Sequence, residues 1–206
     1  LFTPVRPMLA ENAEGIEEVV RKYGRVAFEW KYDGARVQVH KKNGEIAIFS
    51  RRLSNVTSSM PEIVDIVKRN VRAERAILEG EVIAVGSGGK PLPFQELMRG
   101  YRRIKGISEV LREIPLRIYF FDILYINDLE LIDEPYMKRW RILEETCSKE
   151  LLVNRIVTDN VMEAKIFLRE AYNTGHEGLM AKVLDSPYTP GTVSYTHLTL
   201  PTNREV

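Results

Sequence analysis

Apolar and polar residues alternate along most of this chain in short blocks, which is the pattern of strands that bury one face. The blocks that fit a strand are residues 26–30, 37–41, 46–50, 76–85, 116–126, 151–157 and 177–182. Strands outnumber helices and arrive as hairpins and as strand–helix units, without the strict alternation of a doubly wound sheet. The pattern therefore predicts an α+β fold with mainly antiparallel sheets.

Helical spacing and end signals mark fewer segments. Helices are expected at residues 15–23, 93–105, 135–148 and 160–174, and in one further segment that runs to about residue 70. This last helix should begin at the capping box formed by Ser59 and Glu62, and Asn160 should cap the helix that follows it. Asn43 and Gly44 predict a two-residue hairpin turn, whose return strand would bring Arg51 and Arg52 back towards the level of Lys31 and Arg36.

Composition narrows the class of protein. The chain has 206 residues, of which 44% are hydrophobic and 29% charged, and no apolar run approaches the roughly twenty residues that span a bilayer. It shows no signal peptide, and Cys147 is the only cysteine, which fits a reducing cytoplasm and does not favour a zinc site. The net charge of +1 is too low to hold nucleic acid by charge alone, so a DNA partner would require a local patch or another domain.

Residues 29–36, EWKYDGAR, place a lysine, two acids and an arginine just before a strand. A lysine amine is ordinarily protonated at neutral pH, because its pKa lies near ~10.4, and the ammonium is not a nucleophile. Burial and neighbouring cations, including a bound metal, favour the neutral amine, so Lys31 is a candidate nucleophile. A solvated lysine beside a turn at Asp33 and Gly34 is the alternative, and this stretch alone does not decide between them.

Other segments carry candidate chemistry of lower specificity. Period-two spacing puts Glu79 and Glu81 on one strand face, which indicates either an exposed sheet edge or a metal or ribose site. The loop at residues 86–89 lacks the lysine-threonine ending of a P-loop and is not interpreted as a phosphate cradle. A basic cluster indicates either a solvated helix face or a contact with a phosphate backbone. Its members are Arg99, Arg102, Arg103 and Lys105.

Five short motifs with charged residues at strand ends follow one another along the chain. They are KYDGAR (31–36), FSRR (49–52), LEGEV (78–82), FDILY (121–125) and EGLMAK (177–182). In this order they resemble the nucleotidyltransferase motifs of ATP-dependent DNA ligases, particularly those of the archaeal replicative type. RPMLA (6–10) and PFQELM (93–98) are similar to the same family, and the resemblance covers residues 4–191. It implies an ATP-grasp-like nucleotidyltransferase domain with helices flanking the sheets.

The resemblance also implies a reaction. Lys31 would attack the α-phosphorus of ATP and form a lysyl-AMP phosphoramidate, with release of pyrophosphate. Glu81 and Glu177 would bind the ribose or a divalent metal, Mg²⁺ or another cation, since carboxylates are suitable ligands for it. AMP would then pass to the 5′-phosphate of a DNA nick, and the 3′-hydroxyl would displace AMP and seal the strand.

The remaining roles that the resemblance implies concern ATP itself. Glu29 and the backbone near it would contact the adenine, and Phe121 would stack on the ring. Arg36 and Arg51 would hold the ribose and phosphates, and Lys182 would lie near the α-phosphate. Such an arrangement suits phosphoryl chemistry, in which catalysis is mostly positioning and charge stabilisation.

The domain boundaries expected from the resemblance are residues 1–9 as a linker from a missing N-terminal DNA-binding domain and residues 10–191 as the adenylation domain. Residues 193–202 look like the conceptual translation of a transposon-end sequencing adapter, so residues 192–206 are expected to be a non-native, poorly packed tail in which His197 is no ligand. The C-terminal OB-fold of the family would be absent. The chain is therefore expected to bind ATP weakly, to adenylate itself slowly if at all, and not to seal nicks.

The partner implied is nicked double-stranded DNA, in replication, repair and recombination, with a sliding clamp bound through missing regions. A cytoplasmic monomer without membrane contact is expected. Two alternatives stay open: an RNA ligase or mRNA-capping nucleotidyltransferase, and a non-catalytic module that binds nucleotide or DNA.

Overall fold

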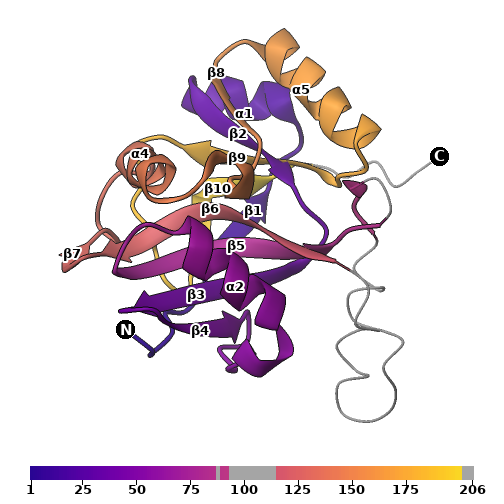
Figure 1. The fold of residues 1–206 in the computed structure, drawn as a ribbon. Helices are drawn as coiled ribbons and strands as arrows, with labels where there is room; N and C mark the ends of the chain where they lie inside the picture. The colour runs from indigo at the N-terminus through magenta and orange to yellow at the C-terminus, as the bar shows by residue number, and fades with distance from the viewer. Residues whose placement is uncertain (87–88, 93–114, 201–206) are drawn as a thin grey trace. The chain divides into compact units, whose positions relative to one another are not determined.

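Two five-stranded sheets carry the fold of the chain (Figure 1). The computed structural model describes residues 1–86, 89–92 and 115–200. These residues fall into two units, each built around one of the sheets. The first unit comprises Leu1–Val5, Asp33–Leu131 and Trp140–Leu152, and the second comprises Arg6–Tyr32, Ile132–Arg139 and Val153–Val206.

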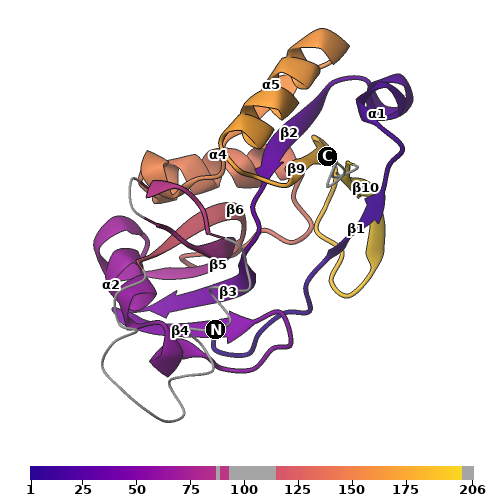
Figure 2. The same ribbon diagram turned by 90° about the vertical axis from the view of Figure 1, so that its right-hand side faces the viewer.

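The sheet of the first unit is antiparallel throughout. Its strands, in spatial order, are β4 (Glu45–Ser50), β3 (Ala35–Lys42), β5 (Arg75–Ala84), β6 (Leu116–Ile126) and β7 (Leu129–Glu130). Asn43 and Gly44 both have positive φ, 49° and 85°, as the predicted two-residue hairpin turn requires. The helix α2 (Pro61–Asn70) lies against this sheet, as both ribbon views show (Figures 1 and 2). Its buried residues are Ile63 and Val67.

The sheet of the second unit has one parallel pair. Its strands, in spatial order, are β1 (Leu9–Asn12), β10 (Val193–Thr199), β9 (Gly178–Val183), β2 (Val26–Lys31) and β8 (Arg155–Thr158), and only β1 and β10 run parallel. The helices α1 (Ile16–Tyr23) and α5 (Val161–Asn173) contact one another, and their apolar faces share a core with Phe28 and Leu179. This arrangement confirms the predicted α+β class with mainly antiparallel sheets flanked by helices.

Some of the expected element ends match the structure and others do not. Asn160 caps α5 by accepting hydrogen bonds from the amides of Met162 and Glu163. The capping box at Ser59 is wrong: Met60 is the N-cap, and Pro61 begins α2, because the fixed φ of proline suits the first helical position. The strand expected at 151–157 is confined to β8, since 149–151 form a short 3-10 helix. The helix α4 (Tyr136–Thr146) lies within the segment predicted for it.

The expectation of a poorly packed tail is wrong for the described residues. Residues 193–199 form β10, which pairs with β9 and β1. Leu198 within β10 and Leu200 just after it are buried in the core of the second unit. The non-native origin of residues 192–206 stays a prediction.

Three earlier expectations lie outside the described residues: the helix at 93–105, its basic cluster, and the motif at 93–98. Within the described parts of the chain, no helix combines the length and apolar character needed to cross a membrane.

Candidate active site

Lys31 stands at the last position of β2, an internal strand of the second unit's sheet. Its ammonium group forms an ion pair with Glu177, the residue that precedes β9. The backbone amide of Glu177 also donates to the carbonyl oxygen of Lys31 at 3.0 Å, so both residues are held by main chain as well as by side chain. The side chains are 27% and 17% exposed, which leaves the amine within reach of a substrate.

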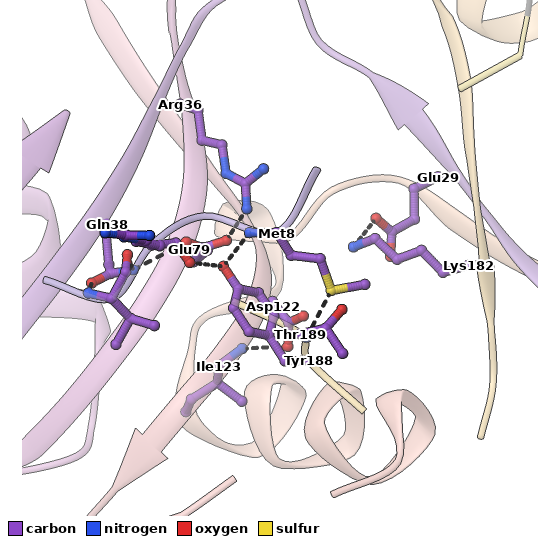
Figure 3. A network of polar contacts seen from close by, with 12 residues as sticks. Met8, Glu29, Arg36, Gln38, Glu79, Asp122, Ile123, Lys182, Tyr188 and Thr189 are labelled. Carbon is purple, nitrogen blue, oxygen red and sulfur yellow. Dashed lines mark hydrogen bonds and ion pairs between the residues drawn. The ribbon is translucent and has the colours of Figure 1, made fainter. Parts of the chain in front are cut away.

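A second lysine–glutamate pair joins the same two segments: Glu29 lies two residues before Lys31 in β2, and Lys182 lies within β9. Lys182 Nζ lies 2.7 Å from Glu29 Oε2, and the side chains are only 4% and 2% exposed (Figure 3). The hydroxyl of Tyr136 donates to the other carboxylate oxygen of Glu29, and Lys182 Nζ lies 4.8 Å from the centre of the Tyr136 ring. A buried carboxylate needs such partners, because charge without them is costly in a region that excludes water.

Aromatic packing holds the residues on either side of Lys31. The His176 ring lies 5.0 Å from the Trp30 ring and 4.4 Å from the Tyr32 ring, measured between centroids. Burial lowers the pKa of His176 to about 4, so its imidazole is neutral at neutral pH. Neither His176 nor Tyr136 was a sequence candidate. The position of His176 directly before Glu177 is the signal that could have identified it.

The second polar cluster belongs to the first unit. The Arg36 guanidinium forms an ion pair with Glu79 and lies 5.3 Å from the centre of the Phe121 ring. Glu81 stands directly opposite Arg36 in the β3–β5 register and is partly exposed. The exposed-edge interpretation of the two acids is wrong, because β5 is an internal strand and Glu79 is only 1% exposed.

Arg51 follows β4 directly and is exposed. Ser50 pairs with Val37 across the hairpin, so the chain leaves β4 at the level where β3 carries Arg36. The hairpin therefore returns Arg51 to the level of Arg36, as expected.

Gly34 provides close packing where the chain enters β3. A Cβ atom at Gly34 would lie 2.2 Å from the carbonyl oxygen of Val82 and 2.8 Å from a methyl carbon of Ile83. Only glycine fits between these atoms without displacing β5. The motif glycine is therefore explained by packing within the first unit.

The candidate residues thus divide into two sets. Lys31, Glu29, Glu177 and Lys182 belong to the second unit, whereas Arg36, Arg51, Glu81 and Phe121 belong to the first. The division falls between Tyr32 and Asp33, inside the motif that carries Lys31. Among the described residues, no three histidine, cysteine or acidic side chains come together as a metal site would require.

Comparison with known proteins assigns the class. A family model described as the ATP dependent DNA ligase domain matches residues 7–198. The chain therefore belongs to the ATP-dependent DNA ligase domain family.

Two of its relatives are DNA ligases of archaea. Those of Thermococcus fumicolans and Methanothrix thermoacetophila are 50% and 47% identical to this chain over 192 and 188 residues, respectively. Each alignment covers 91% of this chain and 34% of the relative. The chain thus spans about a third of the length of the curated relatives it matches.

Solved structures agree in fold. The structure described as mycobacterial DNA ligase D complexed with ATP and MES has a TM-score of 0.72 and 23% identity, and the match covers 97% of this chain and 61% of that one. At this identity the likeness concerns the fold alone.

Proposed function

We propose that this chain is the adenylation domain of an ATP-dependent DNA ligase and that Lys31 is its nucleophile. The observation that carries the proposal is the partly exposed Lys31 amine, held by Glu177 at the end of an internal strand, in a chain of this family. In the reaction the Nζ lone pair forms a bond to the α-phosphorus of ATP. The bond from that phosphorus to the bridging oxygen breaks, pyrophosphate leaves, and the nitrogen loses its proton.

Glu177 is proposed to orient the Lys31 amine before the reaction and to act as the base that accepts the proton of its ammonium group. An ion pair holds the ammonium in place, but only the neutral amine attacks, so the proton must leave as the nucleotide arrives. The Glu177 carboxylate contacts Nζ directly, which makes it the group best placed to accept that proton.

Glu29 and Lys182 are buried and bonded to partners, which limits how each of them is proposed to contact the nucleotide. Both carboxylate oxygens of Glu29 already accept hydrogen bonds, one from Lys182 and one from Tyr136. The backbone near Glu29, more than its carboxylate, is therefore proposed to meet the adenine. Lys182 is proposed to supply positive charge near the α-phosphate, which requires its sealed ion pair with Glu29 to open.

The first unit is proposed to supply the remaining contacts. Phe121 would stack on the adenine, Arg36 and Arg51 would hold the ribose and phosphates, and Glu81 would bind the ribose or a metal. Mg²⁺ is proposed to accompany ATP and to offset the charge of its phosphates. Because Mg²⁺ usually keeps several waters and phosphate oxygens, one carboxylate from Glu81 or Glu177 would be a sufficient protein ligand.

The substrate proposed for the second and third steps is nicked double-stranded DNA. AMP passes from Lys31 to the 5′-phosphate, and the 3′-hydroxyl then attacks that phosphate and releases AMP. Since the net charge of this chain is only +1, much of the grip on DNA is assigned to parts of a longer protein.

The test is intact-mass measurement after incubation with ATP and Mg²⁺, over a time course long enough to detect slow self-adenylation. A mass increase of one AMP is expected in the parent chain and absent in Lys31→Ala. Lys165→Ala is the matched control, because Lys165 is an exposed, ion-paired lysine of the same unit. Loss of the adduct in the control, or its persistence in Lys31→Ala, would contradict the proposal. ATP binding with no adduct in any chain would favour a non-catalytic nucleotide-binding module.

A further inference from the structure

The first unit contains a buried chain of hydrogen bonds that begins at Arg36. The Glu79 carboxylate accepts from two donors (Figure 3). The Arg36 guanidinium donates to one oxygen, and Gln38 Nε2 donates to the other at 3.1 Å. Because Glu79 is almost fully buried, its position depends on these donors and not on water. Arg36 is thereby fixed by a carboxylate that is itself held in place.

Gln38 uses every hydrogen-bonding position of its amide. Its Nε2 donates to Glu79 and to the carbonyl oxygen of Val5 at 3.1 Å, and its Oε1 accepts from the Val5 amide and from His40 Nε2, both at 2.8 Å. A flipped amide would turn its oxygen towards the Glu79 carboxylate and its NH₂ group towards the Val5 N–H. Only one orientation is therefore compatible with these neighbours.

His40 extends the chain to the backbone of Phe2. The Phe2 amide donates to His40 Nδ1 at 2.8 Å, so the imidazole proton lies on Nε2, which donates to Gln38. Burial lowers the pKa of His40 to about 4, which keeps the ring neutral and this tautomer in place at neutral pH. Every donor along the path is thus matched by an acceptor.

We infer that Gln38 is a positioning residue that couples the backbone of residues 2–5 to Arg36 through Glu79. A displacement of residues 2–5 removes the Val5 contacts of Gln38, and Glu79 then loses the donor that opposes Arg36. Since Arg36 lies over the Phe121 ring, the displacement reaches the two first-unit side chains proposed to hold the nucleotide. The part of this inference that concerns ATP rests on the proposed function.

The coupling can be tested without nucleotide, by amide hydrogen exchange of Val5 and Phe2. Glu79→Gln leaves both amides and their acceptors intact, yet it should speed their exchange roughly ten-fold, because Gln38 loses its charged acceptor. Glu45→Gln removes an exposed carboxylate of the same sheet and should leave the exchange unchanged. Equal exchange in the two variants would overturn the inference, whether or not the chain binds ATP.

The effect on the nucleotide is tested by the kinetics of AMP attachment to Lys31. Gln38→Met keeps the side-chain volume and removes the amide. It should raise KM for ATP, taken as the concentration that gives half the maximal rate of single-turnover attachment, roughly ten-fold, with the maximal rate within about two-fold of the parent. Gln38→Glu keeps the shape but sets a carboxylate against Glu79, so its KM should rise at least as much. If Gln38 only fills space, both variants keep the parental KM, and the positioning role is excluded. Absence of any adduct in the parent chain would count against the proposed function, while the exchange result still decides the coupling.

Discussion

Two lysine–glutamate pairs join the same two segments of the second unit in opposite order. Lys31 ends β2 and meets Glu177 just before β9, whereas Glu29 lies within β2 and meets Lys182 within β9. The pair of Lys31 is partly exposed and the pair of Lys182 is almost completely buried. The residue types are identical, and the position along the strands decides which lysine a substrate can reach.

The difference assigns separate roles to the two pairs. A buried ion pair loses its hydration, so it contributes little net stability but is expensive to break. A partly exposed pair is screened by water and can exchange its partner at small cost. The Lys31 pair is therefore suited to release its amine to an incoming phosphate. The Lys182 pair holds β2 and β9 together, and it opens, as its proposed role near the α-phosphate requires, only at a higher cost.

Removing the lysine from each pair should produce the largest contrast. Lys182→Met leaves the Glu29 carboxylate buried beside Tyr136 alone and should lower the free energy of unfolding by about 3–5 kcal/mol. Lys31→Met should change it by less than about 1 kcal/mol. Urea unfolding measures both, with Lys138→Met as a control in an exposed pair with Glu134. Equal losses of unfolding free energy in Lys182→Met and Lys31→Met would contradict the distinction between the buried pair and the partly exposed pair.

Replacing the tyrosine beside each pair by phenylalanine should produce a smaller difference in the free energy of unfolding. Tyr136→Phe removes the hydroxyl that donates to Glu29 and should cost about 1–3 kcal/mol, because a buried carboxylate oxygen loses a donor. Tyr32→Phe removes a long contact of 3.4 Å with the amide of Asn154, which is exposed and can bond to water, so the cost should be below about 1 kcal/mol. The same urea series serves as the measurement, and a larger loss in Tyr32→Phe would reverse the comparison.

Acidification should lower the free energy of unfolding through His176, whose ring packs on the residues on either side of Lys31. Its pKa is about 4 in the folded chain against an ordinary value of 6.5, so the unfolded chain binds the proton more readily. The stability from the neutral ring is complete above about pH 6.5 and is lost as the pH falls towards 4. Discounted for partial exposure, the loss should be on the order of 1 kcal/mol.

The measurement for this prediction compares the urea midpoint at about pH 7 and about pH 4.5 in the parent chain and in His176→Phe. The variant should lose less stability on acidification, because phenylalanine keeps the ring packing and takes up no proton. His40 has a similarly lowered pKa and is present in both chains, so its contribution cancels. Identical pH dependence in the two chains would show that His176 is not responsible.

Local signals predicted the elements that depend on local chemistry. The bounds expected for β6 were correct because residues 116–126 are apolar or aromatic at every position except Arg117 and Asp122. Asn160 was correctly identified as a cap, since its acceptor serves amides two and three residues away. Ser59 was not, because Pro61 provides a competing start to the helix.

Local sequence patterns did not predict contacts between residues that are far apart in the chain. Gln38 binds Glu79 from 41 residues away, and Tyr136 binds Glu29 from 107 residues away, so neither partner could be chosen without the strand register. The same limit explains β10, whose burial depends on the edge that β9 offers it. Lys31 was a candidate from its own stretch of sequence and Glu177 only through the resemblance, whereas their pairing came from the structure.

The position of the AMP group after incubation of the chain with ATP and Mg²⁺ tests the role of Lys31 most directly. Peptide mapping by mass spectrometry distinguishes the peptide that contains Lys31 from the peptide that contains Lys182. AMP is expected on Lys31, the amine that a substrate can reach, and not on Lys182. AMP on Lys182, or on both lysines equally, would contradict the claim that exposure at the strand end selects the nucleophile.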